Sequence, residues 1–279
     1  MSRSLIRAAA ALGVVALGLG LAGCQTPAAG TDDAPSDYVT DGKLTIATGE
    51  PAYYPYVIDD APESGEGFEA AVAYAVAEEL GFAAEDVVWV RTGFDEAIAP
   101  GPKDFDFNLQ QYSITPERAE QVDFSSAYYS AGQAVITIEG SAAASATSIA
   151  DLKELLIGAA TGTTSLAAVE QIIQPTAGAQ VFNSNDDAKL ALESGQVDAI
   201  VVDLPTAFYI TGVELDGGFI VGSLPAIDGQ TDEWGLLLAK DSPLTDAVTA
   251  AVDALRADGT LDALVAEWLG ADQGVAELQ

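Results

Sequence analysis

Apolar strand-like segments alternate with helical segments along most of this 279-residue chain, and this order constrains the fold more than any other feature. The expected strands cover residues 44–48, 87–90, 105–109, 134–138, 156–160, 181–182, 197–202 and 234–239. The expected helices cover residues 68–80, 165–173, 186–195, 243–258 and 261–269, with another starting at Pro205. The alternation restarts after a spacer of small residues that follows residue 138. Such an order predicts an α/β fold with mostly parallel strands and two lobes.

The stretch Ser113-Ile-Thr-Pro-Glu-Arg118 has the pattern of a helix start. Thr115 is a good N-cap and Pro116 suits the first helical position. Arg118 in the first turn opposes the helix dipole, whereas a bound anion would meet free N–H groups, a hydroxyl and a guanidinium there. The alternative is a surface arginine paired with one of the many carboxylates. Within this stretch both interpretations remain open.

Two polar segments follow expected strands of the first half of the chain. Glu50 and Tyr53 come after the strand at 44–48, and Gln110 and Gln111 come after the strand at 105–109. Ligands of α/β sheets bind at the carboxyl ends of the strands. The topology therefore predicts that these segments share a site.

The second half of the chain offers two further candidates. Thr161-Gly-Thr163-Thr164 joins a strand to a helix, which suits a small anion or serves only as routine capping. Asp203 ends an apolar strand, where a carboxylate is either a helix N-cap or the partner of a cation. Nearby, Asn185 is expected to cap a helix, and Ser148 with Asp151 forms a capping-box pattern.

Composition excludes several classes of function. The formal net charge is −33, from 43 acidic and 10 basic residues, so the surface repels nucleic acid and anionic lipid. The absence of histidine removes a histidine base and histidine metal ligands. Cys24 is the single cysteine, which rules out an intramolecular disulfide and cysteine-rich metal sites. We expect no cofactor and no metal.

The N-terminus has the pattern of a targeting segment. Arg3 and Arg7 precede a short apolar run that ends in small residues at Leu21-Ala-Gly-Cys24. This ending resembles a bacterial lipobox, in which the signal peptide (residues 1–23) is removed and Cys24 carries the lipid. An ordinary signal peptide with an incidental cysteine is the alternative. Residues 24–42 are expected to be a flexible, lipid-anchored tether on the extracytoplasmic face of the cell membrane.

Several motifs together resemble one family. They are Gly67-Phe-Glu69, Asp106 with Ser113 to Arg118, Val122-Asp-Phe-Ser125 with Tyr128-Tyr129, Gly162-Thr-Thr164, Gly195 to Asp203, and Ala257-Asp-Gly-Thr260 with Trp268. Residues 43–270 thereby resemble the polar-amino-acid group of extracytoplasmic solute-binding proteins of ABC importers. The resemblance implies a monomer that captures a polar or basic L-amino acid and delivers it to a membrane permease, without enzymatic activity.

The resemblance also implies a two-lobe fold of the type II periplasmic-binding-protein kind with two crossover hinge strands. The first lobe would comprise residues 43–133 and 226–279, and the second residues 138–222. In such a fold the lobes close on the ligand.

Ligand-binding roles follow from the same resemblance, residue by residue. Arg118 would bind the α-carboxylate with help from Ser113 and from Thr163-Thr164 of the other lobe. Asp203 would bind the α-ammonium. Tyr53 would cover the ligand, and Glu50 with Gln111 would face its side chain.

The chain departs from the family pattern at two places. Glu69 stands where aspartate is frequent, which suggests a structural change. Asn108, Gln110, Gln111 and Tyr112 replace small or apolar residues, which suggests a polar group on the ligand. Two other functions stay open: a sensory module that feeds a receptor, and a dehydratase on the same fold with Glu50 or Asp203 as its acid or base.

Overall fold

The structure is a computed structural model that describes residues 37–227, 229–270 and 274–279. The signal peptide, Cys24 and most of the tether expected from the sequence lie outside these residues. None of the helices within the described ranges combines the length and the apolar character needed to cross a membrane.

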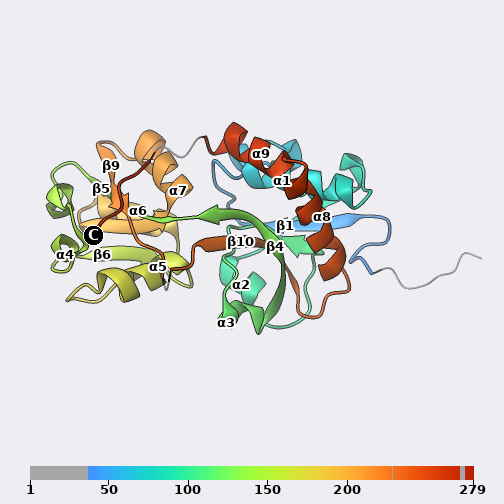
Figure 1. The fold of residues 1–279 in the computed structure, drawn as a ribbon, viewed down its shortest axis with the longest axis horizontal. Helices are drawn as coiled ribbons and strands as arrows, with labels where there is room; N and C mark the ends of the chain where they lie inside the picture. The colour runs from blue at the N-terminus through green and yellow to red at the C-terminus, as the bar shows by residue number, and fades with distance from the viewer. Residues whose placement is uncertain (1–36, 228, 271–273) are drawn as a thin grey trace, which may run out of the picture. The chain divides into compact units, whose positions relative to one another are not determined.

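The first lobe is built on a five-stranded sheet (Figure 1). In spatial order the strands are β2 (Val87–Arg91), β1 (Leu44–Thr48), β3 (Phe107–Asn108), β10 (Asp232–Ala239) and β4 (Val122–Ala131). β1 pairs in parallel with β2 and β3, whereas β10 is antiparallel to β3 and β4. The carboxyl ends of the three parallel strands therefore meet at one edge of the sheet.

The second lobe repeats this plan with another five-stranded sheet. Its strands, in spatial order, are β7 (Gln180–Phe182), β6 (Ile157–Ala160), β8 (Ala199–Asp203), β5 (Gln133–Ile138) and β9 (Gly218–Ser223). β6 is parallel to β7 and β8, and β5 is antiparallel to β8 and β9. The chain crosses between the lobes from β4 to β5 and returns from β9 to β10. This arrangement confirms the expected two-lobe type II fold.

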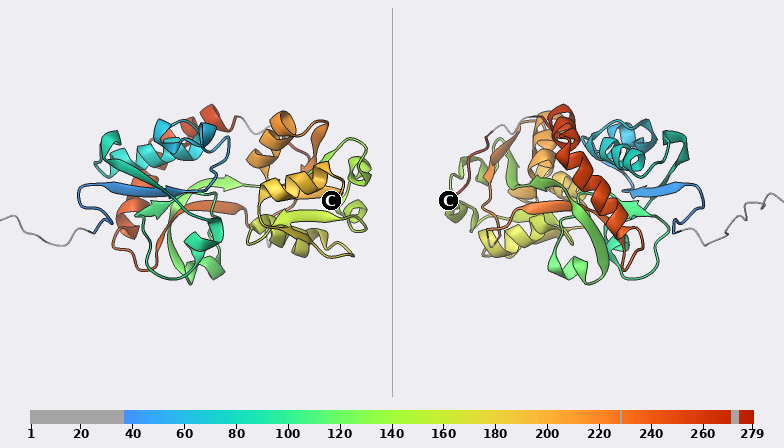
Figure 2. Two further views of the ribbon diagram at one scale, coloured as in Figure 1. Left: turned by 180° about the vertical axis from the view of Figure 1, so that it is seen from behind. Right: turned by 45° about the vertical axis from the view of Figure 1, so that its right-hand side comes forward.

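Helices cover the sheets of both lobes (Figures 1 and 2). The first lobe carries α1 (Phe68–Glu79), α2 (Phe94–Ile98), α3 (Pro116–Ala119), α8 (Thr245–Ala257) and α9 (Thr260–Trp268). The second carries α4 (Ile149–Leu152), α5 (Thr164–Ala168), α6 (Asn185–Glu193) and α7 (Leu204–Tyr209), with π-helical turns at Val169–Ile173 and Ile210–Glu214. Short 3₁₀ turns lie at Ile58–Asp60, Pro62–Ser64, Ala84–Asp86 and Ala142–Ser145.

Each lobe has its own apolar core. In the first lobe, fully buried side chains of α1 and α8, such as Phe68 and Val252, pack with Trp234 of β10. In the second lobe, one cluster that includes Val201 and another that includes Val202 contain alternate residues of β8. Burying one such side chain stabilises the fold by about 1.5–3 kcal/mol. The lobes are thus stabilised by separate apolar clusters.

One local expectation is wrong, and two strands, β4 and β9, were not expected. The N-cap of α6 is Ser184, whose hydroxyl accepts from the N–H of Asp187, and Asn185 is already helical. The ten-residue strand β4 was not expected from the sequence. Its fully buried residues recur every third position because the ladder with β10 contains register shifts, so the two-residue alternation of a strand is lost.

The two sheets also divide the chain differently from the expected boundaries. Gln133 already belongs to the second sheet, in β5. Residues 274–279, assigned from sequence to the first lobe, pack on the second. Leu278 fills a core of the second lobe, and Glu277 forms a bridge with Ser223. The apolar side chain and the backbone pairing together hold this tail there.

Candidate functional site

A cavity of about 410 Å³ is lined by residues of both lobes. The first lobe contributes residues that follow β1, β2 and β3, together with the starts of α1 and α3. The second contributes residues that follow β6, β7 and β8. The carboxyl ends of all six parallel strands thus converge on one space, as ligand sites of α/β sheets do.

Arg118 lies at this cavity in the first turn of α3. Thr115 caps the helix by accepting from the N–H of Arg118, as expected. The guanidinium donates to the carbonyl oxygen of Ser113 at 2.7 Å and, across the lobes, to that of Gly162 at 2.8 Å. Its carbon lies 5.3 Å from the centre of the Phe94 ring. The side chain is therefore fixed by groups from both lobes.

The charge of Arg118 has no carboxylate partner in an ion pair within the described parts of the chain. The residue is only 8% exposed, and burial lowers the pKa of its guanidinium. A buried cation without a paired anion is costly, because neutral carbonyls replace only part of its hydration. The alternative of a surface ion pair is thus wrong, and the site is electrostatically incomplete.

The turn from β6 to α5 faces Arg118 from the second lobe. Thr163 is the N-cap of α5: its hydroxyl accepts from the N–H of Leu166 and donates to the carbonyl oxygen of Ala160. Thr164 instead places its hydroxyl 3.2 Å from that of Ser113 in the first lobe. One threonine shapes the turn, and the other is available at the contact between lobes.

Asp203 occupies the N-cap position of α7, yet its side chain makes no capping hydrogen bond. Its Oδ1 accepts from the Gln133 amide at 2.7 Å, and the same nitrogen donates to Asp232 at 2.6 Å. Burial, and next the charge of Asp232, raise the pKa of Asp203 to about 7. Of the two roles expected from sequence, capping is wrong. The carboxylate lines the cavity, where the charge of Arg118 acts against the rise in its pKa.

Glu69, in the first turn of α1, is a cavity residue to which the sequence assigned only a structural change. It is 2% exposed and accepts hydrogen bonds from the Tyr128 hydroxyl and from both the backbone and the side-chain nitrogen of Gln111. Burial raises its pKa to about 7, although these donors act in the opposite direction. Glu69 thereby holds Gln111, whose φ of 52° is uncommon outside glycine.

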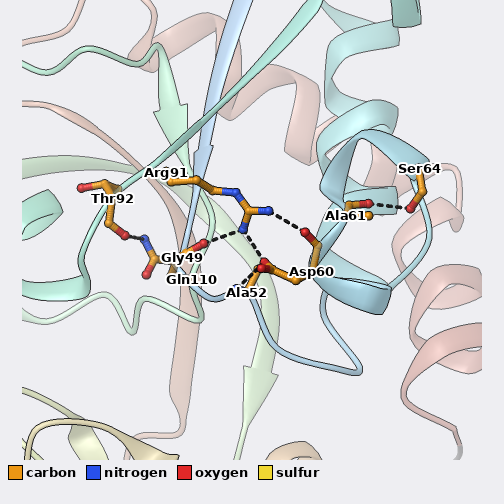
Figure 3. A network of polar contacts seen from close by, with 8 residues as sticks. All are labelled: Gly49, Ala52, Asp60, Ala61, Ser64, Arg91, Thr92 and Gln110. Carbon is orange, nitrogen blue, oxygen red and sulfur yellow. Dashed lines mark hydrogen bonds and ion pairs between the residues drawn. The ribbon is translucent and has the colours of Figure 1, made fainter.

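The loop after β1 is held by a polar network around Arg91 (Figure 3). Arg91 donates to the carbonyl oxygens of Gly49 and Asp60 and forms an ion pair of 2.6 Å with the Asp60 carboxylate. Asp60 also accepts from the N–H of Ala52. These contacts fix the segment that carries Glu50 and Tyr53 to the cavity.

Further contacts join the lobes beside the cavity. The Tyr56 hydroxyl lies 2.9 Å from that of Thr206, and the rings of Tyr54 and Tyr209 lie 4.5 Å apart. Tyr53 lines the cavity itself, and burial together with the Asp186 carboxylate raises the pKa of its hydroxyl. The lobes thus touch through groups that separation would expose.

The residues expected from the sequence come together. All eight line the cavity: Glu50, Tyr53, Gln111, Ser113, Arg118, Thr163, Thr164 and Asp203. Their contact with a ligand stays a prediction. The sequence assigned no role in the site to Glu69, Phe94, Asp95 and Gln133. Each is a single polar or aromatic residue within a helix or strand and belongs to no motif that indicates a ligand. No group of three or more potential metal-binding side chains occurs within the described residues.

Comparison with known proteins identifies the family. The chain matches the bacterial extracellular solute-binding proteins, family 3, over residues 44–271, and it belongs to this family. The L-arginine-binding protein of Pseudomonas aeruginosa is 30% identical over 217 residues, or 75% of this chain and 82% of that protein. The L-cystine-binding protein of Escherichia coli is 30% identical over 227 residues, or 80% of this chain and 81% of that one.

Solved structures agree with this assignment. An ancestral arginine-binding protein bound to arginine is 30% identical with a TM-score of 0.67, covering 81% of this chain and 98% of its own. An ancestral amino acid-binding protein described as a precursor of cyclohexadienyl dehydratase is 29% identical with a TM-score of 0.67, covering 82% and 95%.

Proposed function

We propose that this member of the family-3 solute-binding proteins is the lipid-anchored, substrate-binding component of an ABC transporter. It captures a polar or basic L-amino acid between its lobes and delivers it to a membrane permease. The anchor is the lipid on Cys24, which lies outside the described residues, and the protein acts as a monomer on the extracytoplasmic face.

The observation that carries this proposal is the buried charge of Arg118. Arg118 is 8% exposed, lies at the cavity and forms no ion pair among the residues described, although the charges of Asp232, Asp203 and Asp95 act on it. A ligand carboxylate supplies the missing anion and can accept two hydrogen bonds from the guanidinium. Ser113 and Thr164 bring hydroxyls from opposite lobes to the same place, where Thr163 caps the facing helix.

Asp203 is the complementary partner for the α-ammonium group. Its carboxylate lies on the second lobe, whereas Arg118 lies on the first, so the two charges of an amino acid connect the lobes. Each lobe alone matches only one of the charges. The ligand therefore favours the conformation in which the lobes touch, because only that state satisfies both.

The rest of the cavity fits the side chain of the ligand. About 410 Å³ is within the range of small-molecule sites and exceeds the space that the α-groups of an amino acid need. Tyr53 covers the ligand, and Glu50 with Gln111 faces its side chain. The names of the relatives, which include arginine- and cystine-binding proteins, agree with a polar or basic ligand.

A thermal-shift screen of the ligand-free chain against the twenty common L-amino acids tests the binding function. We expect a rise in Tm with at least one polar or basic amino acid at millimolar concentration. The D-enantiomer of each hit is the matched control, because it reverses the arrangement of the α-groups. No shift with any L-amino acid contradicts the proposal.

Anchoring has a separate test. Expression in a bacterial host with labelled fatty acid is expected to label the wild-type chain and leave Cys24→Ala unlabelled and released from the membrane fraction. Labelling of the Cys24→Ala variant contradicts the anchor, while the binding function stands.

One observation favours a second candidate function, a dehydratase. Glu69 and Asp203 both line the cavity with pKa values of about 7, which suits a general acid. However, both Glu69 oxygens already accept hydrogen bonds from protein groups. Asp203 is needed for the ammonium group. We therefore propose that the protein binds its ligand without turnover. Loss of water from a bound hydroxy acid, detected by mass spectrometry, would favour the dehydratase instead.

A further inference from the structure

Part of the cavity wall carries side-chain oxygens that can accept a hydrogen bond. This acceptor wall consists of the side-chain oxygens of Glu50, Gln110, Gln111 and Asn185. None of these oxygens accepts a hydrogen bond from another group within the described ranges of the chain. The orientation of each amide decides whether the wall offers donors or acceptors to a ligand.

The Gln110 amide donates to two acceptors. Its nitrogen donates to the Thr92 carbonyl oxygen at 3.3 Å (Figure 3) and to Asn108 Oδ1 at 3.2 Å. Reversing the amide would place its oxygen against the Thr92 carbonyl oxygen, which can only accept, so this orientation is favoured. Both N–H groups are used. The oxygen lies beside Gly49, 3.1 Å from where a Cβ would stand.

The Gln111 amide is fixed in the same sense by Glu69. Its nitrogen donates to Glu69 Oε2 while its backbone N–H donates to Oε1. A reversed amide would set its oxygen against a carboxylate. Glu69 thus acts as a positioning residue: it takes one N–H of the Gln111 amide, and the side-chain oxygen accepts no hydrogen bond within the described residues.

The second lobe adds an independent observation. Asn185 Oδ1 is buried at the cavity without any hydrogen-bond partner in the part of the chain that the structure describes. The neighbouring Asp186 interacts with the Tyr53 hydroxyl, which brings this segment to the loop that carries Glu50. An unsatisfied buried acceptor is unfavourable unless a ligand or water donates to it.

Charges at the cavity point the same way. Arg118 is the cationic side chain among the lining residues, against carboxylates at Glu50, Glu69, Asp95, Glu96 and Asp203. The α-groups of an amino acid match Arg118 and Asp203, and Glu69 is bonded to protein donors. Glu50, Asp95 and Glu96 form no ion pair in the described residues.

We propose that the ligand is an amino acid whose side chain is a cation carrying only N–H donors, a guanidinium or an alkylammonium group. This inference rests on the proposed amino-acid-binding function and narrows its substrate class. Glutamine and glutamate fit poorly, because their side-chain oxygens would face acceptors. A guanidinium or ammonium donates to the wall and reduces the excess of negative charge.

Calorimetry with pairs of matched ligands tests this class. L-Arginine is paired with L-citrulline, which has nearly the same shape but carries a neutral urea with a carbonyl oxygen. L-Lysine is paired with the neutral L-norleucine. We expect at least one cation to bind about 100-fold or more tightly than its neutral match, the factor typical of a lost charged partner.

The outcomes separate the two proposals. If a neutral or acidic amino acid binds as tightly as both cations, the substrate class is wrong and the binding function stands. If none of the twenty L-amino acids binds, the binding function is wrong, and the proposed class of cationic ligand is then wrong as well.

A pair of variants tests the wall directly. Glu50→Gln keeps the shape and removes a charge, and we expect it to weaken the cationic ligand about tenfold. Its effect on the neutral match should stay within about twofold. Glu267→Gln, the same change at an exposed position of α9, is the control and should leave both affinities unchanged. An equal loss for the cation and its neutral match would overturn the role of Glu50.

Discussion

Replacing Arg118 by methionine should separate binding from stability. The substitution keeps much of the side-chain volume and removes the charge. In the ligand-free protein it removes two hydrogen bonds, to the carbonyl oxygens of Ser113 and Gly162. Hydrogen bonds from a charged donor contribute about 1.5–3 kcal/mol each, but desolvation of the unpaired buried charge costs several kcal/mol. We expect the free energy of unfolding to change by no more than about 2 kcal/mol.

Binding should respond far more strongly. The α-carboxylate of the ligand would be buried without its cation, which costs about 3–5 kcal/mol. This corresponds to a dissociation constant about 150-fold to 5,000-fold larger. Isothermal titration calorimetry with the tightest-binding amino acid measures the loss, and thermal unfolding without ligand shows that Arg118→Met is folded.

The matched control is Arg256→Met, the same change at an exposed position near the end of α8. It should bind like the wild type. A folded Arg118→Met variant whose dissociation constant stays within about threefold of the wild-type value would refute the reasoning. The buried arginine would then be a structural residue rather than the carboxylate partner.

Four other outcomes follow from the same geometry. Below its pKa of about 7, Asp203 must release a proton before it can pair with the α-ammonium, so the affinity for the ligand should fall about tenfold for each pH unit below 7. Titrations from pH 8 down to 5 measure this dependence, and Asp203→Asn should remove it. The raised pKa of Glu69 makes the folded state retain a proton that the unfolded state loses. The free energy of unfolding should therefore fall by about 1.4 kcal/mol per pH unit as the pH rises from 4.5 to about 7. Denaturant titrations measure this pH dependence, and Glu69→Gln should flatten it over the same range. Tyr56→Phe removes the hydrogen bond to Thr206 and should weaken ligand binding about fivefold, since one bond between the lobes is lost; an unchanged dissociation constant would mean that this contact does not help to hold the lobes together. Gly162→Ala would place a Cβ 2.6 Å from Asp95 Oδ1 and should weaken binding about tenfold or more, whereas Gly178→Ala, with a similar positive φ and nothing within 4 Å, should affect stability alone.

Much of this site could be predicted from the sequence because its signals are local. Thr115 and Pro116 indicate the start of α3, and this start places Arg118 in the first turn of the helix. Strand ends carry Glu50, Gln111 and the turn before α5, and parallel topology brings strand ends together. A motif in chain order is thus enough to place these residues at the cavity.

What could not be predicted depends on contacts between distant residues. The three donors on Glu69 come from Tyr128 and Gln111, 59 and 42 residues away in the chain. The register shifts that hide β4 depend on its pairing with β10. Leu278 fills a core of the second lobe, although the preceding helix belongs to the first. None of these has a signature within a short window of sequence.

The carboxylates around the cavity have different physical roles despite their shared charge. Glu69 accepts hydrogen bonds from protein donors and fixes Gln111. Asp203 is buried near Asp232 and, in our proposal, pairs with the α-ammonium. Glu50 is more exposed and, in our proposal, faces the side chain of the ligand. Environment, rather than residue type, separates a positioning role from a binding role. This is why the acidic composition alone could not indicate the ligand.

A crystal structure of the chain with its tightest-binding amino acid tests the central claim most directly. We expect the α-carboxylate to lie about 3 Å from the Arg118 guanidinium and the α-ammonium to lie at a similar distance from the Asp203 carboxylate, with both lobes in contact with the ligand. A ligand bound outside this cavity, or bound with its carboxylate away from Arg118, would contradict it.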